Sequence, residues 1–333
     1  MAQSSCEVVR RAIQFQNPDR LPVFMPTLGI SDVSWVNWNQ IGVGDKRLRH
    51  TLDEWNCTWS RTDIKNMGQV TGHPLADWSA LKHYHFPDPD NPDLYAGMEK
   101  QFSGTQGKFI FTNLFMLLFE RLHSLRGFSN ALIDLASGDE RFEILADRIV
   151  DYDLAIIRNI SNRFPGQIHA LNFTDDWGTE QRTFINPHIW DSFFKPRYER
   201  IFTAIHKVGW FVWMHSCGEI SGIVNSLIEI GVDVLNLQQP RVFGLERFGQ
   251  QFAGKVAFES LCDIQHTLPF KGQREIEEEA HLLIDYWSTP QGGFILGDYG
   301  DGEAIGVSLE SKRWMYDAFQ AFDRWRTPTR DAT

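Results

Sequence analysis

The stretch "WFVWMHSCGEISGIVNSLIEIGVDVLNLQQ", residues 210–239, contains a complete strand–helix–strand pattern. Residues 210–216 begin with an apolar run that is rich in aromatic side chains, which favours a buried strand. Residues 220–231 carry apolar side chains at helical spacing and end at a glycine, and residues 232–239 form a second apolar run. We therefore expect two parallel strands joined by a right-handed helical crossover.

The same unit recurs through the second half of the chain. Further strands are expected at residues 167–177, 255–261 and 292–300, and further helices at residues 188–209, 243–254, 274–288 and 308–325. Such repeated strand–helix units, with short connections and no glycine-rich phosphate loop, favour a closed barrel over an open doubly wound sheet. The predicted fold is a single (β/α)8 TIM barrel of the α/β class, formed by residues 1–333 as one domain.

The first half of the chain is less regular. Residues 20–29 and 107–114 are predicted to be the first and second strands. Between them, residues 31–93 are rich in Trp, Asp, Gly and Pro and are expected to form an irregular insertion or lid. Its tryptophans could cover an aromatic substrate or form a small core of the insertion itself; they are Trp35, Trp38, Trp55, Trp59 and Trp78.

Composition restricts the class of protein. The 333 residues are 42% hydrophobic and 23% charged, and the formal net charge is −11, which disfavours a nucleic-acid partner. No apolar run reaches the roughly 18 residues that a membrane span needs, and no leader-like segment begins the chain, so we expect a cytoplasmic protein. Four widely spaced cysteines suit reduced thiols. The sequence leaves the oligomeric state open, a homodimer included.

Polar residues follow the predicted strands at their carboxyl ends. In a barrel these ends converge on one mouth, where catalytic side chains gather. The polar residues at these ends are Glu120, Arg121, Asp175, Asp176, His215, Cys217, Gln238, Gln239, Glu259, Cys262, Asp263, Asp298 and Asp301.

His215 and Cys217 form the most specific of these pairs. Side chains two residues apart on a strand share a face, so this imidazole and this thiol can point at one metal ion. Zinc prefers nitrogen and sulfur ligands and keeps one position open in catalytic sites. The alternative is a hydrogen-bonded interior histidine beside a small buried thiol.

The acids Asp175 and Asp176 are adjacent, so strand alternation sends them to opposite sides and only one can serve the mouth. We favour Asp176 as a general acid or metal ligand; in the alternative, both cap the following turn. Gln181 and Arg182 belong to the same predicted loop.

Several blocks together resemble the uroporphyrinogen decarboxylase superfamily, and more closely its methyltransferase-like branch. The blocks include "RRAIQFQNPDRLPVFMP", "LFERLHSLRG", "TDDWGTEQRTFINPHIWDSFFKPRYERI", "MHSCGEISGIVNSLIEIGVDVLNLQQP", "CDIQHTLPF" and "GGFILGDYG", in the family's order. The resemblance implies a (β/α)8 barrel. It also implies one of two activities: decarboxylation of uroporphyrinogen, or methyl transfer between a corrinoid protein and either a thiol or tetrahydrofolate.

Two departures from the family pattern bear on the activity. Residues 25–31, "MPTLGIS", lack the arginines that bind porphyrin carboxylates in the decarboxylases, which argues against uroporphyrinogen decarboxylation as the reaction. Residues 297–302, "GDYGDG", lack the second cysteine of the zinc-dependent methyltransferases. The third ligand is then open among Asp298 or Asp301, Glu120 or Asp176, and Cys262.

The resulting hypothesis is a methyltransferase that moves a methyl group between a small substrate, thiol or tetrahydrofolate and a corrinoid carried on a partner protein, with zinc assisting. The expected roles are catalysis by Asp176, Glu120 and Gln181, cofactor binding by Gln238, Glu259 and Asp298, and metal ligation by His215, Cys217 and Cys262. A metal-dependent lyase or decarboxylase acting on a small non-porphyrin substrate is the alternative enzyme. The third hypothesis is a binding or regulatory protein without catalytic activity.

Overall fold

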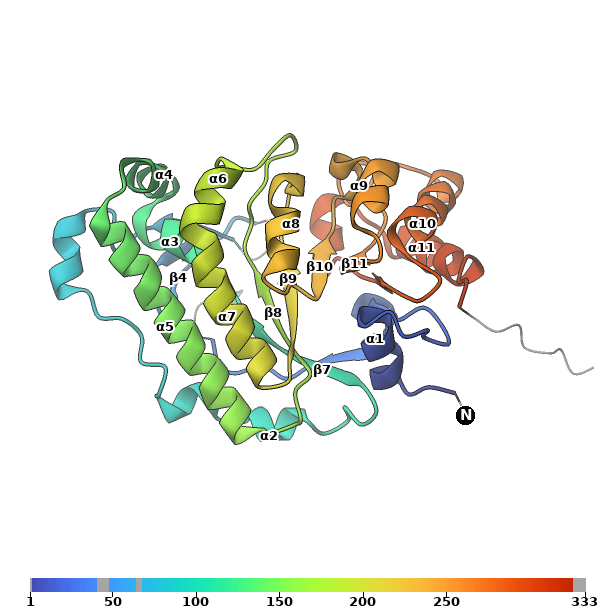
Figure 1. Ribbon diagram of the computed structural model, residues 1–333, viewed down its shortest axis with the longest axis horizontal. Coiled ribbons are helices and arrows are strands. Elements are labelled where there is room, and N and C mark those ends of the chain that lie inside the picture. Colours follow the sequence, from blue (N-terminus) through green and yellow to red (C-terminus); the bar gives the residue numbers. More distant parts are fainter. Residues whose placement is uncertain (1, 41–47, 64–67, 326–333) are drawn as a thin grey trace, which may run out of the picture.

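The computed structural model describes residues 2–40, 48–63 and 68–325 of the chain. Among these residues, seven strands form the central sheet, and all neighbours in it are parallel (Figure 1). Their order is β3 (Val33–Trp35), β7 (Phe109–Leu114), β8 (Ala170–Thr174), β9 (Phe211–His215), β10 (Val234–Leu237), β11 (Ala257–Ser260) and β12 (Phe294–Leu296). The curled parallel sheet with helices around it confirms the predicted α/β barrel class.

The chain segment before β3 joins the two edges of this sheet. Val23 forms a parallel bridge with Leu296 of β12, whose N–H donates to the carbonyl of Pro22 at 2.9 Å. On the other side, the N–H of Asp32 donates to the carbonyl of Val23 at 2.7 Å. The segment between them contains the short antiparallel pair β1 (Phe24–Met25) and β2 (Ile30–Ser31). These contacts close the sheet into a barrel.

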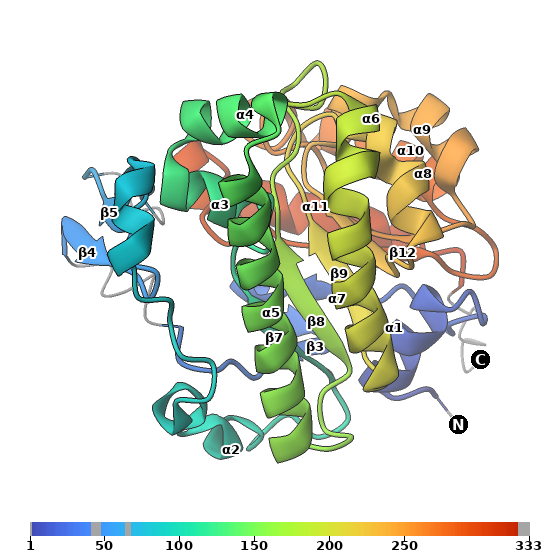
Figure 2. The same cartoon turned by 60° about the vertical axis from the view of Figure 1, so that its left-hand side comes forward.

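Helices cover the outside of the barrel, as the amphipathic patterns predict. α5 and α7 pack side by side in both views (Figures 1 and 2). The predicted helix at residues 188–209 contains a π turn, Trp190–Phe194, just before Pro196, which has no N–H to donate. The outer helices are α5 (Glu140–Arg163), α6 (Pro187–Ile189), α7 (Lys195–Lys207), α8 (Ser221–Glu229), α9 (Leu245–Phe252), α10 (Gln273–Trp287) and α11 (Leu309–Ala321).

Shorter elements fill the connections. Two helices follow β7, namely α3 (Phe119–Arg126) and α4 (Phe128–Ser137), and α2 (Met98–Gln101) precedes it. Short 3-10 turns lie at Pro26–Leu28, Trp78–His83, Pro92–Tyr95, Pro240–Phe243 and Gly302–Ile305. Within the described ranges, no helix combines the length and the apolar character that a membrane crossing requires.

Helix α1 (Ser5–Ile13) covers the amino ends of the strands. Its Val9 and Ile13 pack with the buried side chains inside the barrel, such as Phe111 and Trp213. The carbonyl of Ala12 also accepts the N–H of Gly293, just before β12, at 2.8 Å. This end of the barrel is therefore closed by apolar packing, which leaves the carboxyl end for a site.

Residue range 31–93 is only partly separate from the barrel. Its first residues form β3 of the main sheet, while β4 (His50–Leu52), β5 (Thr58–Ser60) and β6 (Gln69–Gly72) form a small antiparallel sheet at the left edge of Figure 2. Trp55 and Trp59 are fully buried, and the indole N–H of Trp59 donates to Asp53. Both tryptophans therefore pack inside the fold, and Trp55 belongs to the main hydrophobic core.

Asp32 connects three segments at the closure of the barrel. Its buried carboxylate accepts hydrogen bonds from the hydroxyl of Ser5, the guanidinium of Arg20 and the N–H of Val23, at 2.5 to 2.9 Å. Removing one partner of a buried charge pair leaves the other without compensation. The Asp32 contacts therefore hold α1 and the first strand to β3.

We expect Asp32→Ala to lower the free energy of unfolding by about 2–3 kcal/mol, because Arg20 and two further donors lose their acceptor. Urea unfolding followed by circular dichroism measures this. Glu7→Ala is the control: its i,i+4 pair with Arg11 is solvent-exposed, and its loss should cost less than about 0.5 kcal/mol. Equal losses in the two variants would contradict the assignment.

Candidate active site

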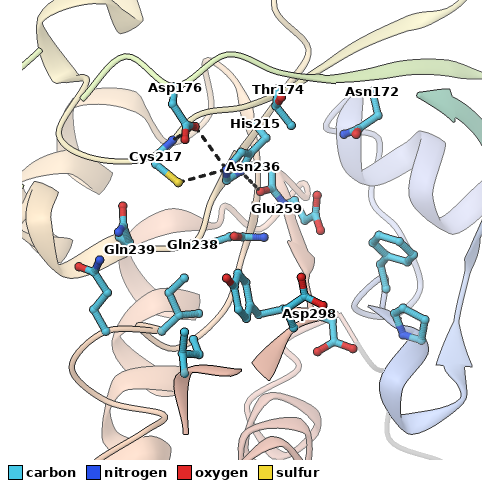
Figure 3. Close-up of a pocket in the computed structure, with 18 of the residues that line it drawn as sticks. Asn172, Thr174, Asp176, His215, Cys217, Asn236, Gln238, Gln239, Glu259 and Asp298 are labelled. Atoms are coloured by element: carbon cyan, nitrogen blue, oxygen red, sulfur yellow. Dashed lines mark hydrogen bonds and ion pairs between the residues drawn. The ribbon is translucent and has the colours of Figure 1, made fainter. Parts of the chain in front are cut away.

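Four neighbouring strands place a polar side chain at one level of the barrel. Strand register pairs Thr174 of β8 with His215 of β9, His215 with Asn236 of β10, and Asn236 with Glu259 of β11. Alternate side chains on a strand share a face, so these four groups lie above the apolar interior, toward the carboxyl ends of the strands (Figure 3).

These side chains line a cavity of about 760 Å³, a volume that suits a small organic ligand. The lining comes from strand ends and from the loops that follow them, as expected for a barrel mouth. Its polar members are Glu120, Asn172, Thr174, Asp176, His215, Cys217, Asn236, Gln238, Gln239, Glu259, Gln265, Asp298, Tyr299 and Asp301.

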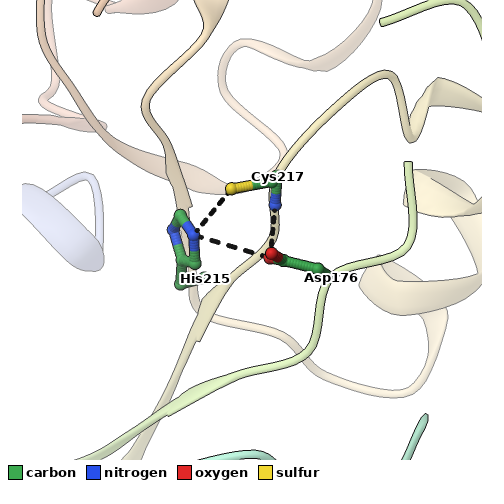
Figure 4. A group of neighbouring side chains, drawn as sticks. All are labelled: Asp176, His215 and Cys217. Carbon is green, nitrogen blue, oxygen red and sulfur yellow. Dashed lines mark hydrogen bonds and ion pairs between the residues drawn. The ribbon is translucent and has the colours of Figure 1, made fainter. Parts of the chain in front are cut away.

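Asp176, His215 and Cys217 form a compact triad at one side of this cavity (Figure 4). Sγ of Cys217 lies 3.3 Å from Nε2 of His215, and Oδ1 of Asp176 lies 3.6 Å from the same nitrogen. One possible ligand atom from each residue lies within 4.8 Å of the other two. The imidazole at the end of β9 and the thiol two residues further on therefore lie together, and the neighbouring loop adds a carboxylate.

Two glycines allow the loops after β8 and β9 to approach this closely. Gly218 has φ +77°, and a Cβ there would lie 2.3 Å from the backbone of Gly178. The N–H of Gly178 donates to the carbonyl of Cys217 at 3.1 Å, and the N–H of Cys217 donates to Oδ1 of Asp176 at 2.8 Å. Backbone contact between the loops thus fixes the carboxylate beside the thiol.

Asn236 orients the imidazole of His215. Their side chains meet at 2.6 Å between Nδ1 of His215 and Oδ1 of Asn236. With Oδ1 as acceptor, Nδ1 carries the proton, and Nε2 offers its lone pair toward Asp176 and Cys217. This outer contact is the kind that fixes the tautomer of a metal-binding histidine.

The triad fits a zinc ion in its donor set. One imidazole nitrogen, one sulfur and one carboxylate oxygen match the three-ligand pattern of catalytic zinc sites, which keeps a fourth position open. Burial and the nearby Asp176 and Glu120 carboxylates raise the pKa of the Cys217 thiol well above its ordinary value. A divalent cation bound at this point would instead lower the pKa of the thiol. The observed third partner of His215 and Cys217 is Asp176.

Glu120 enters the cavity from the first turn of α3. Burial, followed by the charges of Asp176 and Asp175, raises its pKa well above the ordinary value, and the hydroxyl of Thr174 donates to its Oε2 at 2.7 Å. Asp175 points the other way and accepts the N–H groups of Leu118, Phe119 and Glu120 at 2.7 to 3.0 Å. Asp175 therefore fixes the start of α3, and Glu120 with it.

Gln238, Glu259 and Asp298 also reach the cavity. Oε2 of Glu259 accepts the indole N–H of Trp213 at 2.7 Å, and burial raises the pKa of this carboxyl to about 7. Asp298 is paired with Lys312 at 2.6 Å.

Cys262 and Gln181 are not brought to this site. Cys262 is fully buried, and its Sγ donates to the carbonyl of Ile276 at 3.4 Å. Gln181 is exposed and borders a separate shallow depression with Arg247. Sequence proximity to a strand end was the reason to include them, but each side chain turns away from the mouth.

Several polar residues of the cavity lining are absent from the sequence prediction, Thr174 and Asn236 among them. Thr174 and Asn236 were detectable as polar residues inside apolar strands. Thr174 stands two positions before Asp176, and Asn236 stands two positions before Gln238. Gln239 was noted, but its function was not: its Oε1 accepts the N–H of Gly218 at 2.7 Å and so holds the Cys217 loop.

Comparisons with known proteins find likeness in structure but not in sequence. No protein-family model and no curated protein matches this chain. A methyltransferase from Methanosarcina mazei is similar in structure, with a TM-score of 0.66 and 11% identity over 96% of this chain and 99% of that chain. Xylanase 10B from Thermotoga maritima reaches a TM-score of only 0.32, at 11% identity over 62% of this chain and 79% of that chain. This score is too low to indicate a shared fold. At 11% identity the first match shows a shared barrel fold; membership of the uroporphyrinogen decarboxylase superfamily stays a prediction.

We expect protein purified without chelator to contain about one zinc per chain. His215→Ala, Cys217→Ala and Asp176→Asn should each lose most of it, because each removes one of three ligands. Elemental analysis measures the content, and circular dichroism checks folding. Cys262→Ala is the matched thiol control and should keep its zinc; retention in both cysteine variants would remove the proposed site.

Glu259 should make the stability of metal-free protein depend on pH. Its pKa is about 7 in the folded state and near 4.5 ordinarily, so between these values the folded state binds more protons than the unfolded state. The free energy of unfolding therefore falls as pH rises through this window, by up to about 3 kcal/mol. Glu259→Gln removes this loss, so its stability relative to the parent should rise from pH 5 to pH 8 in chelator-treated samples. A difference that does not change with pH would contradict the assignment.

Proposed function

We propose that this protein is a methyltransferase that moves a methyl group between a corrinoid carried by a partner protein and the sulfur of a small thiol or thioether, with zinc assisting. The observation that carries the proposal is the convergence of Asp176, His215 and Cys217 on one side of a cavity of about 760 Å³. Fold likeness to a methyltransferase supports it.

The residues present fit a resident zinc ion. Held by Nε2 of His215, Sγ of Cys217 and a carboxylate oxygen of Asp176, it would supply a Lewis acid that lowers the pKa of a substrate thiol. Asn236 would keep the imidazole in the tautomer that exposes Nε2. The cavity beside the triad leaves room for the rest of the substrate.

The reaction balances in atoms and electrons. As a thiol accepts the methyl group, its S–H bond breaks, a bond forms between sulfur and the methyl carbon, and the bond from that carbon to the corrinoid cobalt breaks with both electrons staying on cobalt. The reverse direction returns a proton to sulfur as the thioether is cleaved. Glu120 lines the same cavity and has a pKa raised by burial, and it is the group we assign to this proton exchange at its Oε atoms.

A separate corrinoid protein suits this chain. The sequence carries no Asp-x-His-x-x-Gly cobalamin-binding motif. Methyl transfer needs an in-line approach of the nucleophile and the methyl carbon, and a cavity at the carboxyl end of the barrel offers an entrance for a docked carrier. Tetrahydrofolate is the other carrier that the family resemblance allows.

A metal-dependent lyase or decarboxylase is the second candidate. The favouring observation is Glu120, a carboxyl with raised pKa in the same cavity as the triad, since a protonated acid can deliver a proton to a carbanion. Release of carbon dioxide from a small carboxylic acid, without any methyl transfer, would favour this function.

We expect zinc-loaded protein to accelerate the transfer of the methyl group from free methylcobalamin to 2-mercaptoethanol, followed by the change in absorbance of the corrinoid. His215→Ala should lose the activity together with the zinc. Glu120→Gln should keep the zinc and lose about 100-fold or more in rate, because it cannot exchange a proton. Cys262→Ala serves as the control with near-parental rate. A parental protein that carries zinc and gives only the uncatalysed rate would contradict the proposal.

A further inference from the structure

The cavity has an unusual balance of charge. Its lining contains no lysine or arginine among the residues that the structure describes, and His215 is its one imidazole. Five carboxyl groups face it, those of Glu120, Asp176, Glu259, Asp298 and Asp301. An anionic group of a substrate would find no fixed cation here, although carboxylates, sulfonates and phosphates are normally held by arginine or lysine.

Within the described ranges, only Asp298 is neutralised by a cationic side chain of the protein. Lys312 lies 2.6 Å from its Oδ1, both side chains are 3% exposed, and the lysine also donates to the carbonyl of Tyr299. The ammonium group of Lys312 is therefore paired inside the fold and does not face a ligand. The carboxylate of Asp301, three residues after Asp298, has no hydrogen bond or ion pair to the described residues.

A bound zinc ion would not reverse this balance. Its two positive charges would be offset by the thiolate of Cys217 and the carboxylate of Asp176. On the rest of the lining, Asp298 is already paired with Lys312, and burial disfavours the charged forms of Glu120 and Glu259. The carboxylate of Asp301 would stay without a counter-charge. The far part of the cavity therefore favours a positive ligand group whether or not the triad holds metal.

Aromatic side chains supply the other half of a cation site. Five of them line the cavity: Phe24, Trp35, Phe115, Phe270 and Tyr299. Trp35 is 38% exposed and Phe270 is 76% exposed, so both present ring surface that the fold does not cover. The faces of such rings attract organic cations, and the strength increases where water is excluded.

From this lining we propose that the small substrate is an organic cation, a thiol or thioether whose other end is an alkylammonium group held between the acidic side chains and aromatic rings of the mouth. The sulfur end of this assignment rests on the proposed function. The ammonium end rests on the cavity alone and can be tested without metal or methyl transfer.

The first experiment compares three ligands of similar size by calorimetry on chelator-treated protein. Choline is the cation, 3,3-dimethylbutan-1-ol is its uncharged isostere, and 2-hydroxyethanesulfonate is the anion. We expect choline to bind about tenfold more tightly than the alcohol and the sulfonate to bind most weakly. Equal affinity for choline and the alcohol, or tighter binding of the sulfonate, would overturn the proposal.

Two variants identify the source of the selectivity. Asp301→Asn removes the unpaired carboxylate and should reduce the preference for choline over the alcohol by about threefold or more. Asp317→Asn, on the exposed face of α11 outside the lining, changes the net charge equally and should leave the preference unchanged. Trp35→Leu should weaken choline more than the alcohol. An unchanged preference in both Asp301→Asn and Trp35→Leu would overturn the assignment.

The second experiment repeats the comparison on zinc-loaded protein with thiols that differ in their tails, namely 2-aminoethanethiol, 2-mercaptoethanol and 2-mercaptoethanesulfonate. We expect the same order of affinity: cation, neutral, anion. A choline preference in metal-free protein combined with no zinc in the parental protein would overturn the methyl-transfer function and support the cation site. Zinc-dependent methyl transfer to the sulfonate thiol in preference to the amine thiol would overturn the cation site and support the function.

Discussion

The alternation of side chains on parallel strands is the constraint on which the site depends. In a closed parallel sheet, every second residue of every strand faces the interior, and hydrogen-bond register fixes which residues share a level. Here one level carries Thr174, His215, Asn236 and Glu259 on four adjacent strands, directly above an apolar interior. A slip of one residue in any of these strands would turn its polar group outward and break the level.

Packing between loops completes the triad, because the alternation of side chains along the strands does not by itself place Asp176 and Cys217. Cys217 stands just past the end of β9, and Asp176 just past the end of β8, so neither is held by the ladder itself. The contact between Gly178 and Gly218 brings the two loops together, and Gln239 anchors the second loop from the next strand. The triad is therefore built from two successive strand ends, those of β8 and β9, and its carboxylate depends on glycine at two positions.

Burial sets the chemistry of the carboxyl groups around the triad. Glu120 and Glu259 face the cavity from opposite parts of the barrel, and in both burial raises the pKa, whereas Asp298 is balanced by Lys312. Such separation of acid groups by environment is typical of sites that handle protons. Among the described residues, the same cavity has no lysine or arginine in its lining, which instead carries aromatic rings and carboxyl groups.

The sequence by itself determined the barrel class, each strand–helix unit of the second half, and the pairing of His215 with Cys217, because these follow from local periodicity. It could not place Val33–Trp35 in the main sheet, since a strand of three residues has too little pattern to separate it from a loop. It also could not choose among Asp176, Cys262 and the acids near Asp298 as partner of the pair. That choice depended on which loops touch and which side chains turn inward, and contacts between segments far apart in the chain exist only once the sheet has closed.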